Sequence, residues 1–406
     1  MTTRIWSDSA QEISDDALVT RAEGMTFLGR PAMDDRSLDL LATISRDILA
    51  APQARAMPQY MALGYWLRPA SLKRVKAEFE ASSSNDDVVV APRGVALHLP
   101  PTNVDTICVY SWAVSVLAGN CNIVRLPKSV APGTEWLIGL IAAAIDRSGE
   151  SDRQIFCTYD YGGDLEKRLS ATIDLRMIWG GDSKVETVSR IPIRPDGLSL
   201  GFPDRKSFAV FETTAYRDAA SAERDKLAQN FFNDVFWFDQ MGCGSPRILF
   251  WVGDPGDLAR DFFHRLYAVT EQKSHETPTG VAIAKLVHLH DLLGRDVGTH
   301  GYTVGNAVTV LETRDIPEAL KETQGGGFLH TAVLPELDAL AEYANRKLQT
   351  ITHFGFSETE LRCLARVISG RGGYRIVPVG RALQFDATWD GIALLSHATR
   401  RIRCEV

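Results

Sequence analysis

The feature that most constrains the fold is an alternation of short apolar runs with helix-like segments between about residues 86 and 353. Runs such as 122–126 and 175–179 have the length and the branched side chains of buried strands. Segments such as 105–117 and 135–145 repeat their apolar residues with helical spacing. This alternation predicts mainly parallel sheets with crossover helices. Because 406 residues are too many for one hydrophobic core, we predict an α/β fold with two lobes and a cleft between them.

The chain divides into four expected parts. Residues 1–85 should form a helical N-terminal region that packs on the first lobe, and the lobes should span 86–215 and 216–385. The tail, 386–406, should return to the first lobe. Within the lobes we also expect Thr134 to cap a helix and residues 336–347 to form another helix.

Composition excludes several classes of protein. Hydrophobic residues make up 45% and charged residues 23% of the chain, which is typical of globular proteins. A net charge of −7 without a basic stripe argues against nucleic-acid binding, and no apolar run reaches the roughly 18 residues of a membrane span. The six cysteines contain no C-x-x-C pair, so we expect a reducing, cytoplasmic location. His288, His290 and Asp291 lack an evident further ligand, so we expect no metal.

One cysteine lies in a motif that suits either a packed thiol or a nucleophile. Cys243 lies between two glycines in "WFDQMGCGSPR" (residues 237–247). A cysteine there is either a packed thiol in a turn or a nucleophile. For the second interpretation, Gly242 and Gly244 would leave room for an acyl group and let a backbone N–H face the developing oxyanion. A thiolate attacks thioesters and aldehydes readily.

Four segments in a fixed order resemble the aldehyde dehydrogenase superfamily. They are "PRGVALHLPPTNVDTICVYSWAVSVLAGNCNIVRLPKS" (92–129), "WFDQMGCGSPR", the segment 301–350 beginning "GYTVGNAVTV", and "YRIVPVGRALQFDATWDG" (374–391). The last resembles the acyl-CoA reductase branch, which includes the fatty acyl reductase of bacterial luminescence systems. The resemblance covers roughly residues 86–398. It implies that the first lobe binds a nicotinamide cofactor and that the second lobe carries the nucleophile.

The resemblance also implies roles for individual residues. Cys243 would be the catalytic nucleophile, and Asn103 would provide the amide of the oxyanion hole. Pro100, Gly180 and Gly181 would contact the cofactor, because they occupy the turns that hold it in the family. Val185 stands where the family has a second glycine of this turn, so that contact departs from the pattern.

Two cations suggest which cofactor is preferred. Arg125 replaces the family's ribose-binding lysine, and Lys128 replaces an acid that favours NAD. Two positive charges beside the ribose would attract a 2′-phosphate. We therefore predict NADPH, with NADH as the alternative. Tyr302 stands near the position of a ribose-binding glutamate, so one cofactor contact is lost or replaced.

An absent residue points to the reaction. Hydrolytic members carry a glutamate that activates water, but the corresponding run 198–208, "LSLGFPDRKSF", has none. Without this base the acyl-enzyme should survive for another nucleophile or for a hydride. We expect reduction of an acyl-CoA or acyl-carrier thioester to an aldehyde, with an acyl-activating enzyme as partner and a homo-oligomeric assembly. An acyl-phosphate reductase and a non-catalytic acyl-transfer subunit remain the alternatives.

Overall fold

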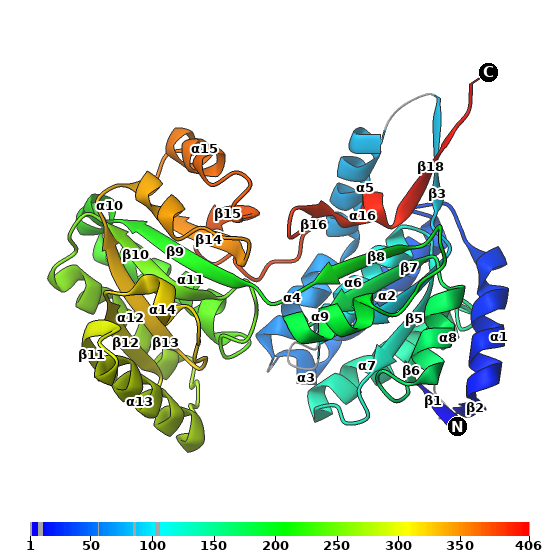
Figure 1. The fold of residues 1–406 in the computed structure, drawn as a ribbon, viewed down its shortest axis with the longest axis horizontal. Helices are drawn as coiled ribbons and strands as arrows, with labels where there is room; N and C mark the ends of the chain where they lie inside the picture. Colours follow the sequence, from blue (N-terminus) through cyan, green and yellow to red (C-terminus); the bar gives the residue numbers. More distant parts are fainter. Residues whose placement is uncertain (1, 7–10, 56, 84–86, 102–105, 406) are drawn as a thin grey trace. The chain divides into compact units, whose positions relative to one another are not determined.

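The computed structural model describes residues 2–6, 11–55, 57–83, 87–101 and 106–405. The chain forms two units, one of residues 1–204 with 385–406 and one of residues 205–384. Both have the α/β architecture that the alternation predicts (Figure 1). The first unit ends before the strand Lys206–Glu212, which belongs to the second sheet, and therefore earlier than the expected division after residue 215.

The first unit is built on a seven-stranded sheet with the order β2-β1-β6-β5-β4-β7-β8. Five of these strands run parallel, and β1 and β2 form an antiparallel edge. Their bounds are β1 Thr2–Trp6, β2 Gln11–Ser14, β4 Val95–Leu99, β5 Cys121–Leu126, β6 Gln154–Thr158, β7 Leu175–Trp179 and β8 Leu198–Phe202. After β6 the chain crosses to the far side of β4. Such a reversal places a ligand site at the carboxyl ends of β4 and β7.

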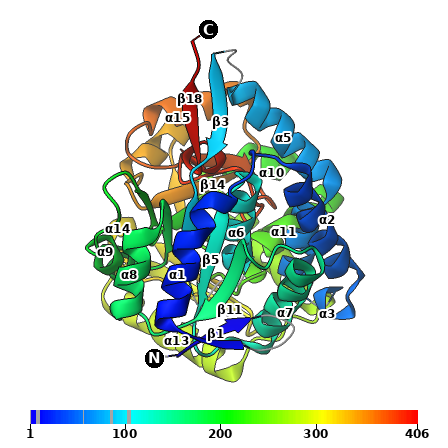
Figure 2. The same ribbon diagram turned by 90° about the vertical axis from the view of Figure 1, so that its right-hand side faces the viewer.

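Helices cover both faces of this sheet (Figure 2). One apolar face packs against α1 (Asp15–Met25), α8 (Asp164–Thr172) and α9 (Asp182–Ser189). The other carries α6 (Thr106–Leu117), where Trp112 packs edge-on against Phe156 of β6. The remaining helices of the unit are η1 Thr26–Leu28, α2 Asp35–Ala50, α3 Pro52–Arg55, α4 Pro58–Trp66, α5 Pro69–Ser83, α7 Pro132–Arg147 and α16 Leu394–His397.

The chain end returns to the first unit. β18 (Thr399–Arg403) pairs antiparallel with β3 (Val88–Pro92), and β16 (Thr388–Trp389) pairs with β17 (Ile392–Ala393). The Tyr110 ring of α6 packs against Phe385 and Trp389 with centroid separations of 5.2 and 5.1 Å. Aromatic packing of this kind ties the tail to the sheet's helical layer.

The second unit has a seven-stranded sheet with the order β11-β12-β13-β10-β9-β14-β15. Only β11 runs antiparallel to its neighbour. The bounds are β9 Lys206–Glu212, β10 Pro246–Val252, β11 Gly298–Val304, β12 Val308–Thr313, β13 Phe328–Leu334, β14 Leu348–Phe354 and β15 Arg375–Pro378. The chain leaves β9, passes through α10 (Thr213–Asp218) and α11 (Ser221–Phe236), and enters β10.

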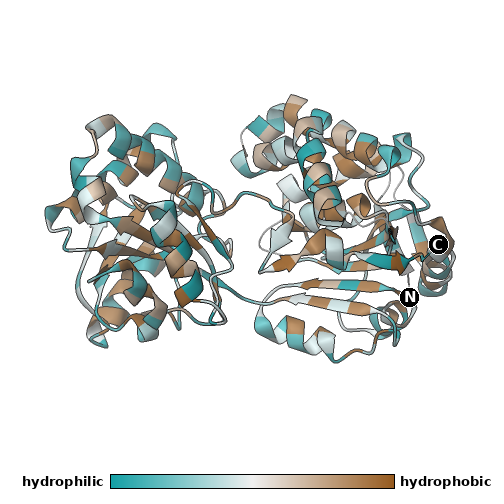
Figure 3. Ribbon diagram, turned by 90° about the horizontal axis from the view of Figure 1, so that it is seen from above, coloured by the Kyte–Doolittle hydropathy of each residue, from teal (hydrophilic) through white to brown (hydrophobic). Residues whose placement is uncertain are grey.

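Alternate residues of these strands face two separate apolar cores. Figure 3 shows the apolar residues gathered along the strands of the sheet. One core joins the sheet to α11 and to α12 (Asp257–Gln272). The other joins it to α14 (Ile316–Ala319), η2 (Leu337–Glu342) and α15 (Glu358–Val367). Leu289 and Leu292 of α13 (Thr279–Gly294) pack against the β12 and β13 end of the sheet.

Three local expectations were wrong. Within the expected helical region 1–85, Thr2–Trp6 and Gln11–Ser14 are strands, because β1 finds a partner in β6. The helix that Thr134 was expected to cap begins three residues earlier than expected, at Pro132, and its N-cap is Ala131. Proline suits a first helical position because its missing N–H would have no partner there. The expected helix 336–347 is a short 3₁₀ turn, Leu337–Glu342.

Two further properties concern the described residues alone. Their helices include none with both the length and the apolar character of a membrane span. Their His, Cys, Asp and Glu side chains form no group of three or more suited to a metal ion.

Candidate active site

Cys243 lies in the turn between α11 and β10, and its side chain is partly exposed. Asp239 and Gln240 adopt left-handed backbone conformations with φ of 47° and 65°. Two such residues in succession are uncommon outside glycine and reverse the chain sharply. The reversal presents the cysteine at the amino end of β10.

Gln240 explains how this turn is held. Its side chain is fully buried and uses both ends of its amide. The oxygen accepts the Gly327 N–H at 3.0 Å, and the nitrogen donates to the carbonyl oxygens of Pro246 at 2.8 Å and Phe328 at 3.0 Å. A buried amide with satisfied partners fixes one geometry. The glutamine of the motif is therefore a support for the cysteine turn.

Ser207 is a second support, which sequence analysis missed. Its hydroxyl, at the start of β9, donates to the Cys243 carbonyl oxygen at 2.7 Å and accepts the Thr350 N–H at 3.1 Å. The side chain is fully buried. It lies within the run 198–208 that drew attention only for its missing glutamate. A serine contact with a distant backbone carbonyl leaves no signal in the sequence.

The two glycines around Cys243 have a different role from the one expected. A Cβ at Gly244 would lie 2.6 Å from the Ala382 carbonyl oxygen, and one at Gly242 would lie 3.0 Å from Leu383 Cδ2. Both separations are shorter than ordinary van der Waals contact. The space that we expected the glycines to leave for an acyl group is filled at these positions by the loop before residue 385.

Cofactor candidates gather at the carboxyl edge of the first sheet. Pro100 directly follows β4, and Arg125 lies at the end of the neighbouring strand β5. Gly180 follows β7 with φ 153°, and Gly181 is the N-cap of α9. These strands are adjacent and parallel, so their ends meet where the strand order reverses. Helix N-termini at such a place bind phosphate well. Asn103 lies outside the described residues.

Lys184 of α9 joins this edge, and sequence analysis did not single it out. Its ammonium donates to the carbonyl oxygens of Leu99 at 3.2 Å and Pro100 at 2.6 Å. Burial and the nearby Arg125 lower the pKa of Lys184 to about 8. A Cβ at Gly180 would lie 2.8 Å from Lys184 Cδ, so this side chain packs over the turn.

Arg125 and Lys184 approach the same tyrosine ring. The Arg125 guanidinium lies 5.5 Å from the Tyr161 centroid, and the Lys184 ammonium lies 6.0 Å from it. Lys128 differs, because it forms an ion pair with Asp160 at 2.5 Å in which both side chains are largely exposed. The positive charge available at this edge therefore comes from Arg125 and Lys184 more than from Lys128.

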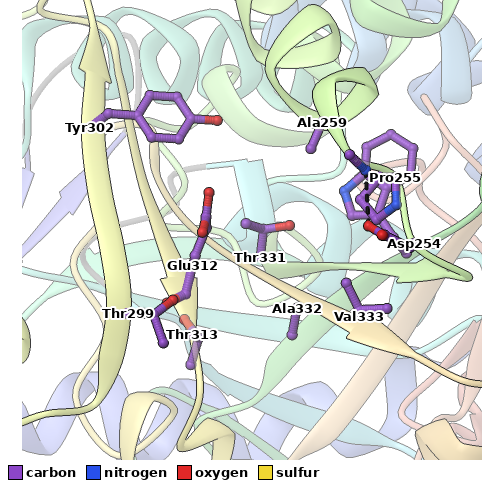
Figure 4. A pocket seen from close by; sticks show the side chains of 12 residues that line it. Asp254, Pro255, Ala259, Thr299, Tyr302, Glu312, Thr313, Thr331, Ala332 and Val333 are labelled. Atoms are coloured by element: carbon purple, nitrogen blue, oxygen red, sulfur yellow. Dashed lines mark hydrogen bonds between the residues drawn. The ribbon is translucent and has the colours of Figure 1, made fainter.

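A cavity of about 360 Å³ in the second unit lies away from the thiol. It is bounded by the carboxyl end of β10, at Trp251 and Asp254, and by neighbouring strands. Figure 4 shows Tyr302 and Glu312 beside Thr331 in this cavity. Cys243 precedes the amino end of β10, which begins at Pro246. From Pro246 to Trp251 there are five residue steps, which span roughly 17 Å along a strand. The cavity is therefore separate from the cysteine turn.

Comparison with known proteins identifies the family. The model of the family described as "Acyl-CoA reductase (LuxC)" matches residues 68–401. The chain belongs to this acyl-CoA reductase family. The matched region includes the cysteine turn and the carboxyl edge of the first sheet. A long-chain acyl-protein thioester reductase of Aliivibrio fischeri is 27% identical over 173 residues, which are 41% of this chain and 34% of that protein. The match thus spans about a third of the relative's length.

Solved structures confirm the aldehyde dehydrogenase fold. A glyceraldehyde-3-phosphate dehydrogenase (GapN) of Methanocaldococcus jannaschii, complexed with NADP, is similar with a TM-score of 0.66 and 12% identity. The similarity covers 96% of this chain and 93% of that chain. An aldehyde dehydrogenase of Mycobacterium tuberculosis, complexed with NAD⁺, has a TM-score of 0.66 at 11% identity and covers 96% and 91% of the two chains. Identities this low establish the fold alone.

Proposed function

We propose that the protein reduces an acyl thioester to an aldehyde with a nicotinamide cofactor, through an acyl group bound covalently to Cys243. The observation that carries the proposal is the built turn around a partly exposed thiol. Gln240 and Ser207 hold this turn with five hydrogen bonds to backbone groups. One of these bonds anchors the Cys243 carbonyl oxygen, and three reach Gly327, Phe328 and Thr350 in other parts of the second unit. Membership of the acyl-CoA reductase family supports the same reaction.

The chemical steps follow from a thiolate at this position. Cys243 attacks the acyl carbonyl, a new C–S bond forms, and the thiol of the donor leaves with its electron pair and gains a proton. The amide of Asn103 would donate to the oxyanion, which is worth about 3–4 kcal/mol in comparable sites. When bound, the nicotinamide supplies the hydride that reduces the acyl group. Collapse of the resulting thiohemiacetal releases the aldehyde and restores the thiolate.

The run from 198 to 208 supports reduction over hydrolysis. It contains no glutamate. Its Ser199 side chain accepts a hydrogen bond from the buried Arg176 at 3.1 Å, and its Ser207 side chain holds the cysteine turn. Neither group is a base that would activate water at neutral pH. The acyl-enzyme should therefore persist long enough to be reduced.

The carboxyl edge of the first sheet fits a dinucleotide. The N-terminus of α9 offers backbone N–H groups to a pyrophosphate, and Gly180 and Pro100 border it. Arg125 and Lys184 add positive charge there. We propose NADPH as the preferred cofactor, because this charge favours a 2′-phosphate, with NADH as the alternative. Proteins of similar fold are complexed with either NADP or NAD⁺, so the fold does not decide between them.

The acyl donor is proposed as a class. Acyl-CoA and an acyl-protein thioester present the same reacting bond to Cys243, and the Aliivibrio relative is named for the second. A partner acyl-activating enzyme, a homo-oligomeric assembly and a cytoplasmic location remain predictions. They follow from the family resemblance and from the six free cysteines.

Oxidation of NADPH and of NADH by the purified protein tests the proposal. The assay uses a panel of acyl-CoA thioesters of different chain length, with Cys243→Ala as the matched variant. Mass spectrometry of the intact protein follows the acyl adduct in parallel. We expect turnover with at least one thioester, faster with NADPH, and neither turnover nor adduct in the variant.

Other outcomes favour the alternatives. An adduct on Cys243 without turnover would favour the acyl-transfer subunit or a donor protein that the assay lacks. Turnover with acyl phosphate but not with thioesters would favour the acyl-phosphate reductase. Wild-type turnover in Cys243→Ala would refute the covalent mechanism.

A further inference from the structure

A buried carboxylate lies close to the cysteine turn in the fold. Asp234, near the end of α11, is 1% exposed. One of its oxygens accepts the Gly380 N–H at 2.7 Å, and the other accepts the Ala382 N–H at 2.9 Å. Ionised side chains are rarely buried this deeply without a strong reason. Here the carboxylate binds two backbone N–H groups of one loop.

This loop, residues 379–384, reaches the nucleophile segment. The Ala382 carbonyl oxygen and the Leu383 side chain fill the positions where Gly244 and Gly242 would carry a Cβ. The loop therefore packs against the residue on each side of Cys243. The chain at Gly380, with φ 92°, also passes so close to Asn230 of α11 that a Cβ there would lie 2.8 Å away.

Other contacts also hold the loop: Val379 packs in the core beside α11, and the Arg381 N–H donates to the Pro378 carbonyl oxygen at 3.2 Å. Arg375 donates to the Ala382 carbonyl oxygen at 3.0 Å, and the Val379 N–H donates to the His353 carbonyl oxygen at 3.2 Å. The loop follows β15, the edge strand of the sheet, so its N–H groups at 380 and 382 find no strand partner. Asp234 supplies that partner with both of its oxygens. This part of the chain lies in the "VPVGRALQF" stretch, to which the proposed reaction assigns no chemistry.

We propose that Asp234 is a positioning residue for the Cys243 nucleophile. Its carboxylate holds the loop 379–384 against Gly242 and Gly244, and the loop in turn fixes where the sulfur is presented. Asp234 acts through the backbone of the loop and takes no part in bond making. The inference rests on the proposed role of Cys243, but the reactivity of the thiol can be measured without any acyl substrate.

The test compares Asp234→Asn with wild type at pH 8. The variant keeps the volume of the side chain, but its amide NH₂ would face one of the two N–H donors, so the loop should detach on that side. The readout is the rate at which iodoacetamide alkylates Cys243, followed by peptide mass spectrometry. Cys363→Ser and Cys404→Ser remove the exposed cysteines from every protein compared.

Two further variants separate positioning from general loss of stability. Thr213→Val removes a partly buried hydrogen bond of 2.9 Å to the Gly253 carbonyl oxygen, at the carboxyl ends of β9 and β10 and so away from the cysteine turn. Leu383→Ala removes the loop side chain that packs on the glycines and leaves Asp234 intact. We expect alkylation to change about tenfold or more in Asp234→Asn and in Leu383→Ala, and less than twofold in Thr213→Val.

Each of these measurements either supports or overturns the inference about Asp234. In the full reaction, Asp234→Asn should lower kcat and leave KM for the thioester nearly unchanged, because the substitution does not alter binding of the acyl donor. Alkylation of Asp234→Asn at the wild-type rate would overturn the inference, whatever the variant's stability. If Asp234→Asn does not fold, unchanged alkylation in Leu383→Ala overturns it. If the thioester assay shows that Cys243 is not catalytic, the alkylation rates still test whether Asp234 positions the thiol, because they need no acyl substrate.

Discussion

The Asp234 carboxyl should make the stability of the second unit depend on pH. Burial raises the pKa of this carboxyl from 3.8 to about 7, while the N–H groups of Gly380 and Ala382 and the charge of Arg375 oppose the rise. Between these two pH values the folded protein binds one more proton than the unfolded chain. The stability that this bound proton gives the folded protein is fully present below about pH 4, and it is lost as the pH rises through about 7.

The size of the effect follows from the same pKa. A rise from 3.8 to about 7 corresponds to about 4 kcal/mol in the free energy of unfolding. Between pH 5 and pH 8 the wild-type protein should lose about 2–3 kcal/mol through this group. Asp234→Asn has no titrating group here, so the difference between wild type and variant isolates the contribution from all other carboxyls and histidines.

Urea unfolding at pH 5, 6, 7 and 8 measures this difference. Pulsed hydrogen exchange of peptides from β9 and β10 reports on the second unit alone, which matters because two units can unfold separately. We expect the free energy of unfolding of wild type relative to Asp234→Asn to fall steadily across the series. A difference that stays constant within about 0.5 kcal/mol would refute the claim that this carboxyl titrates near neutral pH in the folded state.

Three more perturbations test the site. Gly244→Ala places a Cβ against a backbone carbonyl oxygen and should cost about 1–3 kcal/mol in urea unfolding. It should also slow acylation of Cys243 about tenfold or more, whereas Gly280→Ala, which lies in α13 and meets no atom within 4 Å, should neither destabilise the protein nor slow acylation. Ser207→Ala removes the hydrogen bond to the cysteine carbonyl and should destabilise the protein by about 1–2 kcal/mol, so an unchanged urea midpoint would contradict its supporting role. Lys184 loses its charge above its pKa of about 8, so NADPH binding, followed by fluorescence titration, should weaken about tenfold from pH 7 to 9. Lys184→Met should lack this step, and an identical pH dependence in that variant would exclude Lys184 as its source.

Much of the architecture could be predicted from sequence because it depends on local periodicity. The strands 175–179 and 247–252 and the helix 105–117 appear in the structure within about two residues of their expected bounds. The two α/β lobes follow from their alternation. The edge strands β1 and β2 were not predicted, because β1 is a strand only through its pairing with β6, more than a hundred residues away.

The candidate site divides in the same way. The sequence singled out Cys243 through its motif between two glycines, and the family resemblance added Arg125, Gly180 and Gly181; the roles of all four stay predictions. Only the tertiary structure disclosed Ser207, Asp234 and Lys184 as supports of these places. Each of the three bonds to backbone atoms of residues distant in the chain. Backbone N–H and C=O groups are the same in every residue, so such contacts leave no pattern of side chains to read.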